Sequence, residues 1–160
     1  MSQYTFESAV KAIPYSQEVV YARISDLNNL EKIRERLADP TVQAAIQQQV
    51  PADKMGDLQQ KLSEMEFDTD SVRFNAPPIG NVCLHIIERE IPKCVKFEAE
   101  GVPMAMNMWI QLVPQDDSSC KMKITLRAEL NMFIKGMVSK PLQQGVDRLA
   151  DMLASIPYGF

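Results

Sequence analysis

The chain has 160 residues, of which 46% are hydrophobic and 24% are charged, and its formal net charge is -4. This length suits one domain with a sizeable core. The acidic balance lacks the basic footprint of a nucleic-acid-binding protein. No stretch is long and apolar enough for stable insertion into a membrane. The first residues lack the basic start and apolar run of a signal peptide, so we expect a cytoplasmic location.

One strand and two short helices are predicted at the start of the chain. Residues 4–13 alternate between polar and apolar side chains, with Val10 on the apolar side, and predict one strand. Ser16 stands where a helix N-cap is expected, and Asp26 or Asn28 can cap a second short helix. The expected buried side of the first helix is Val19, Val20, Tyr21 and Ile24.

Residues 41–62 carry several apolar side chains at helical spacing, punctuated by Pro51 and Gly56. We interpret this segment as a helical insertion or lid within a single domain that spans residues 1–160. No internal repeat and no linker divides the chain.

Six further runs between residues 65 and 130 alternate between apolar and polar side chains. Short loops separate them, which favours an antiparallel sheet with one apolar face. Glu88 falls in the same register as Leu84 and Ile86, near the end of its strand, where it could orient a ligand or reach solvent at the rim. Trp109 falls in the opposite, outward register, where it could pack under a loop or mark a partner surface.

A long helix is predicted at the C-terminus, from about Phe133 to Ile156. Pro141 predicts a break after a short first helical piece, with Ser139 as the cap of the main helix. Gly145 lies on the apolar stripe, where it could allow close packing on the sheet or leave room for a ligand. The stripe consists of Val138, Leu142, Gly145, Val146, Leu149, Leu153 and Ile156.

This order of elements, and the segment Ile13 to Asp26 above all, resembles the helix-grip superfamily. That superfamily includes START-like lipid-transfer domains, polyketide cyclases and aromatases, and coenzyme Q-binding proteins. The chain is most similar to small bacterial polyketide cyclase-like members of unknown activity. The resemblance implies an α+β fold in which a seven-stranded, curved antiparallel sheet wraps around the C-terminal helix, with two short helices after the first strand.

The sequence offers few residues for catalysis or metal binding. His85 is the only histidine and falls in the outward register, so a role as general base is disfavoured. Cys83, Cys94 and Cys120 show no metal-ligand spacing, and the strand register places Cys83 too far from Cys94 for a disulfide. We interpret all three as reduced, incidental thiols. We therefore predict no catalytic residue, no metal site and no cofactor.

The methionines alternate along one predicted strand, and their flexible side chains suit either a core or a pocket that adapts to an apolar ligand. We favour simple core filling for Met104 and Met122, which lie near strand ends, and leave both interpretations open for Met106 and Met108. The predicted ligand-binding residues are Phe74, Ile86, Phe97, Met106, Met108, Leu126, Leu142, Val146 and Leu149.

The favoured function is binding of a hydrophobic small molecule, such as a lipid, a quinone or a polyketide-like compound, between sheet and helix. Such a protein would act as a carrier, a sequestering protein or a sensor. One alternative is a cyclase-like enzyme that uses the same pocket and needs inward acid-base groups. Another is a protein-interaction module with a filled core and an exposed apolar patch at Trp109 or at residues 41–62. A homo-oligomer is left open.

Overall fold

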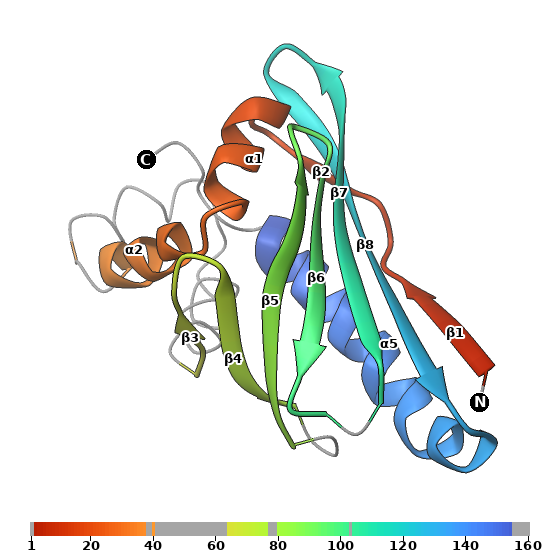
Figure 1. The fold of residues 1–160 in the computed structure, drawn as a ribbon. Helices are drawn as coiled ribbons and strands as arrows, with labels where there is room; N and C mark the ends of the chain where they lie inside the picture. The colour runs from red at the N-terminus through yellow and green to blue at the C-terminus, as the bar shows by residue number, and fades with distance from the viewer. Residues whose placement is uncertain (1, 38–39, 41–63, 77–79, 103, 155–160) are drawn as a thin grey trace.

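The computed structural model describes residues 2–37, 40, 64–76, 80–102 and 104–154. An antiparallel sheet packs against a long C-terminal helix, and two short helices lie at one end of the sheet (Figure 1). The predicted insertion or lid at 41–62 lies outside the described residues. The helices are α1 (Gln17–Ile24), α2 (Asn28–Leu37) and α5 (Met132–Ala154).

The sheet confirms the predicted antiparallel arrangement. Its order is β1-β8-β7-β6-β5-β4-β3, and β2 also pairs with β8. β1 and β2 together occupy one edge, so the sheet is seven strands wide as expected (Figure 1). The strands are β1 (Ser2–Glu7), β2 (Lys11–Ile13), β3 (Glu66–Phe67), β4 (Ser71–Ala76), β5 (Gly80–Glu90), β6 (Cys94–Glu100), β7 (Met106–Asp116) and β8 (Ser119–Leu130).

Burial follows the predicted alternation along the central strands. In β7, buried residues alternate with half-buried ones from Met106 to Leu112. α5 packs directly on β8, β1 and β2, so one face of the sheet and the apolar stripe of the helix cover each other. The contacts of α5 are concentrated on β8, β1 and β2. The helix therefore packs less closely on the strands at the opposite side of the sheet.

The first helix forms as predicted and is tied to the end of the sheet. The Ser16 hydroxyl accepts a hydrogen bond from the Val19 N–H at 3.3 Å, as an N-cap should. The buried Gln17 side chain donates to the Leu112 carbonyl at 3.1 Å, and the Tyr21 hydroxyl donates to the Cys94 carbonyl at 3.2 Å. These bonds hold α1 against β6 and β7. The prediction was wrong for Val19, whose side chain is exposed, because the buried face of α1 consists of Gln17, Val20, Tyr21 and Ile24.

The prediction of one continuous strand over residues 4–13 was wrong, because the chain gains one residue near Ser8. Glu7 pairs with Thr125, whereas Lys11 pairs with Met122, one position out of step. The Ser8 hydroxyl accepts a hydrogen bond from the Ile124 N–H at 2.9 Å. A one-residue shift exchanges the two faces of a strand, so Val10 is 60% exposed.

The predicted register of Glu88 was also wrong, because β5 contains a bulge just before this residue. Ile86 faces Phe97, but Glu88 faces Lys96, so Ile87 is the extra residue on β5. The bulge turns Glu88 to the outer face, where it is exposed, and gives the inner register to Arg89.

The predicted break at Pro141 does not occur, and α5 is continuous from Met132 to Ala154 with Pro141 inside it. Proline lacks the N–H that would bond to the carbonyl four residues earlier. Ser139 is not a cap, since its hydroxyl donates to the Lys135 carbonyl at 2.6 Å within the helix. Packing of the stripe on the sheet on both sides of Pro141 compensates for the lost bond, because Val138, Leu142 and Val146 are all buried.

Candidate functional site: an apolar cavity between sheet and helix

A cavity of about 260 Å³ lies between the inner face of the sheet and α5. It forms where the helix leaves the strands, because α5 contacts β8, β1 and β2 but not β4 to β6 to the same extent. The described residues that line it are Leu27, Leu30, Met65, Phe67, Val72, Phe74, Val82, Leu84, Phe97, Met106, Met108, Ile110, Leu126, Pro141, Leu142, Gly145, Val146, Arg148, Leu149, Met152 and Leu153.

Most of the residues predicted to bind a ligand lie around this cavity. The sheet contributes Phe74, Phe97, Met106, Met108 and Leu126, and the helix contributes Leu142, Val146 and Leu149. Ile86 is the exception, since it is buried but does not line the cavity. It is the last residue before the β5 bulge.

Two of the four methionines discussed above line the cavity, and the other two are buried in the core outside it. Met106 and Met108 line the cavity from the middle of the sheet, whereas Met104 and Met122 are buried outside its lining. Gly145 lines the cavity as well, and a Cβ atom added there would meet no heavy atom within 4 Å. Glycine therefore leaves open space at this point of α5, rather than allowing close packing of helix on sheet.

The lining has one polar side chain among the described residues, that of Arg148. All the others are aliphatic, aromatic, methionine, proline or glycine. Such a surface favours binding of an apolar compound by burial of its surface, with few polar contacts to orient it. Arg148 is missing from the sequence prediction because it is a charged residue and was not counted as part of the apolar stripe of α5.

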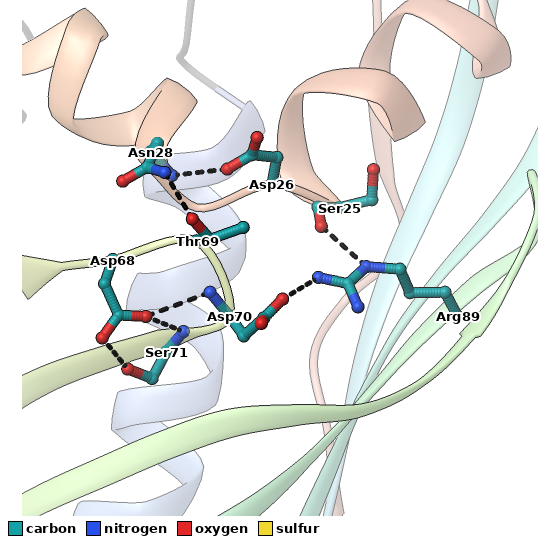
Figure 2. Close-up of polar contacts among 8 residues, drawn as sticks. All are labelled: Ser25, Asp26, Asn28, Asp68, Thr69, Asp70, Ser71 and Arg89. Carbon is teal, nitrogen blue, oxygen red and sulfur yellow. Dashed lines mark hydrogen bonds and ion pairs between the residues drawn. The ribbon is translucent and has the colours of Figure 1, made fainter.

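Two further lining residues, Leu27 just before α2 and Leu30 in its first turn, were not among the predicted ligand-binding residues. Polar contacts attach this segment to residues 68–71 and to Arg89 (Figure 2). The Leu27 N–H donates to the Thr69 carbonyl at 3.1 Å. The Asn28 side-chain amide donates to the Thr69 hydroxyl at 2.7 Å, so the α1–α2 link is attached to the β3–β4 turn.

Arg89 joins the same cluster from the bulged end of β5 (Figure 2). Its Nε donates to the Ser25 carbonyl at 2.9 Å, and its Nη2 forms an ion pair with Asp70. The turn itself is ordered by Asp68, which accepts hydrogen bonds from the Ser71 hydroxyl and the Asp70 and Ser71 N–H groups. The Ser71 hydroxyl and these N–H groups lower the pKa of Asp68. Serine and aspartate at residues 68–71 are the sequence signal for such a turn.

Replacing Arg89 with alanine is expected to lower the free energy of unfolding by about 1 kcal/mol, since the ion pair is exposed and one bond to a carbonyl is lost. The exchange of the Leu27 amide with solvent should become faster, because its acceptor Thr69 would be held less firmly. Denaturant unfolding and hydrogen exchange would measure both effects. Lys121→Ala, on the outer face of β8, is the control; if both variants behave alike, Arg89 does not hold the helix pair.

The candidate nucleophiles and bases lie away from the cavity lining. His85 Nδ1 is 3.5 Å from Glu100 Oε1 on the outer face. Burial, together with nearby glutamates, raises the pKa of the Cys94 thiol, and burial and Glu18 raise that of Cys120, so both thiols carry little of the reactive thiolate. The described residues contain no group of three or more potential metal ligands.

Trp109 lies on the outer face between two cations. The Lys96 ammonium and the Arg127 guanidinium are each 5.3 Å from the centre of its ring, within the range of cation–π attraction. The ring is half-buried, so it forms no open apolar patch of its own. None of the helices described in the structure has the length and apolar character needed to cross a bilayer.

No protein-family model matches the chain, and no curated protein matches it in sequence. Solved structures do match. Norcoclaurine synthase from Thalictrum flavum has a TM-score of 0.63 at 12% identity, over 96% of this chain and 92% of that one. A Thermobifida fusca protein solved by NMR has a TM-score of 0.57 at 13% identity, over 97% and 93% of the two chains.

A conserved protein from Geobacillus kaustophilus has a TM-score of 0.52 at 15% identity, and the match covers 95% of this chain and 91% of that one. At such identities, the matches establish the arrangement of the elements over nearly the whole chain and nothing of the chemistry. The matches extend over nearly all of this chain, which includes its sheet, the two short helices after the first strand and the long C-terminal helix. The fold of this chain is therefore the helix-grip fold.

Proposed function

We propose that the protein binds a hydrophobic small molecule in the cavity between the sheet and α5, as a carrier, a sequestering protein or a sensor. The observation that supports this most directly is the composition of the lining, in which one side chain among the described residues is polar. Burial of apolar ligand surface would supply the affinity, at roughly 25 cal/mol per Å². The fold is compatible with this role, since norcoclaurine synthase has been solved in complex with dopamine and hydroxybenzaldehyde.

The ligand would contact two walls of different character. Phe74, Phe97, Met106, Met108 and Leu126 would form the sheet wall, and Leu142, Val146 and Leu149 the helix wall. Methionine side chains repack at low cost, so Met106 and Met108 would adapt the wall to the shape of the ligand. The ligand remains a lipid, a quinone or a polyketide-like compound in this proposal, and the three free cysteines suit a cytoplasmic setting.

Two alternatives have less support. A cyclase-like enzyme would need acid-base groups next to the substrate, and the one polar residue in the described lining is Arg148, which is neither an acid nor a base at neutral pH. An interaction module with a filled core fits poorly with a cavity of about 260 Å³. Its expected apolar patch at Trp109 is replaced by a ring covered by two cations.

A titration with N-phenyl-1-naphthylamine, a neutral apolar probe that fluoresces in apolar surroundings, tests the proposal. We expect saturable binding of one probe per chain and a melting temperature that rises with probe concentration, since the probe would bind the folded state. A chain with a filled, dry core would show neither effect. Native mass spectrometry of protein purified from its source would then reveal the mass of any compound bound in the cell.

A further inference from the structure

Arg148 stands alone as a polar group at an otherwise apolar cavity. It lies on α5 with its side chain exposed, one helical turn from Gly145 on the same side of the helix. Among the residues that the structure describes, it forms no hydrogen bond and no ion pair. A cation at the edge of a cavity, with all its donors available, can receive a ligand group without first breaking a contact.

The acids nearest to Arg148 on the helix are engaged elsewhere. The Asp151 carboxylate forms an ion pair with the Lys11 ammonium at 2.6 Å. The Asp147 carboxylate accepts a hydrogen bond from the Gln143 side chain at 3.3 Å. The guanidinium of Arg148 therefore keeps its positive charge available in a chain whose net charge is -4.

The chemistry of the guanidinium selects one class of partner. Its donors form a planar fork that matches the two oxygens of a carboxylate or phosphate, and such charge-assisted pairs are stronger than neutral hydrogen bonds. An oxyanion at the cavity edge is thus the complement of this site.

The size of the cavity limits the apolar part of the ligand. A water molecule occupies about 30 Å³ of the liquid, and a methylene group is of similar size, so 260 Å³ holds roughly eight to ten such groups. One medium-length chain or a small ring system matches this volume.

We propose that the ligand is a single-chain amphiphile with an anionic head, whose tail fills the cavity and whose carboxylate or phosphate pairs with Arg148. The proposal rests on the proposed function, because it specifies the ligand of the same cavity. It makes Arg148 the residue that determines specificity for the charged head, while the apolar walls bind the tail.

Three probes that share one tail separate the two parts of the site: decanoate, decyl phosphate and decanol. Their affinities would be measured by calorimetry for the wild-type protein, for Arg148→Gln and for Lys140→Gln. Lys140 is the matched control, since it is an exposed cation on the same helix that does not line the cavity. Melting temperatures of the three proteins would show that each variant is folded.

For Arg148→Gln we expect decanoate or decyl phosphate, or both, to bind about five- to tenfold more weakly, and decanol to bind within about twofold of the wild type. Whichever anion is affected identifies the head group. Lys140→Gln should leave all three affinities unchanged. Added salt should weaken binding of the anions to the wild type more than to Arg148→Gln, because salt screens an exposed charge pair.

The outcomes distinguish the inference from the function on which it rests. If decanol binds and the anions lose no affinity in Arg148→Gln, or lose no more than in Lys140→Gln, the role of Arg148 is overturned and the apolar site stands. If none of the three probes binds the wild-type protein, both the anionic ligand and the proposed function are overturned.

Discussion

Replacing Gly145 with leucine is expected to weaken binding of N-phenyl-1-naphthylamine at least about tenfold while the protein stays folded. A side chain added at Gly145 enters open space at the cavity, since a Cβ atom there meets nothing within 4 Å. The four added carbon groups would occupy roughly 100 Å³, a large share of the 260 Å³ available. Fluorescence titration would measure the loss of binding.

The chain offers a matched control for this experiment on the same helix. Gly136 is also a helical, exposed glycine with open space around its Cβ position, but it does not line the cavity. Both substitutions should raise helix stability by up to about 1 kcal/mol, because leucine is a better helix former than glycine. Equal probe binding by the two variants would show that the probe binds outside the cavity.

Met106→Trp fills the cavity from the opposite wall and should weaken probe binding in the same way. Met106 lines the cavity from β7 and is 5% exposed. The larger ring would cost about 1–3 kcal/mol if the cavity were too narrow for it. Retained fold and retained binding in both Met106→Trp and Gly145→Leu would place the binding site elsewhere.

Replacing Ile124 with alanine should have the largest effect on stability, lowering the free energy of unfolding by about 2–5 kcal/mol. Ile124 has no exposed surface, lies opposite Ile110 in the centre of the sheet and does not line the cavity. Its removal leaves a void in a close-packed region rather than enlarging a space that already exists. Urea unfolding would measure the change, and probe binding by the folded fraction should persist.

Lys123→Ala is the control, one residue away on the outer face of β8. Its ammonium is 3.4 Å from Glu7 Oε1 in an exposed pair, and such pairs contribute little. We expect a change of no more than about 0.5 kcal/mol. Similar losses for Ile124→Ala and Lys123→Ala would mean that the two faces of β8 are assigned wrongly.

Most of the fold could be predicted from the sequence, because its elements have strong local signals. The alternation of buried and half-buried residues from Met106 to Leu112 depends only on the two-residue period of a strand. The helix cap at Ser16 depends only on one hydroxyl and one nearby N–H. The register errors at Val10 and Glu88 have a common cause. Each follows an extra residue, at Ser8 or Ile87, that reverses the faces, and this residue is defined by pairing with another strand.

The candidate site, like the fold, could be predicted only where its residues belong to regular elements. Residues such as Phe97 and Leu142 line the cavity because each lies on the apolar face of a regular element. Leu27 and Arg148 could not be found by that rule. Leu27 reaches the cavity because the α1–α2 link is bonded to Thr69 and Arg89 holds Ser25, and these partners are more than 40 residues distant in sequence.

The sequence by itself determined which faces are apolar, and hence that the sheet and the C-terminal helix must cover each other, since this follows from side-chain period and burial of apolar surface. Only the tertiary structure decided that α5 packs on the β8 side and leaves a cavity near β4 to β6. It also decided that Pro141 stays within the helix and that Arg148 stands at the cavity edge. Those outcomes depend on the distance and angle between packed elements, which no local pattern specifies.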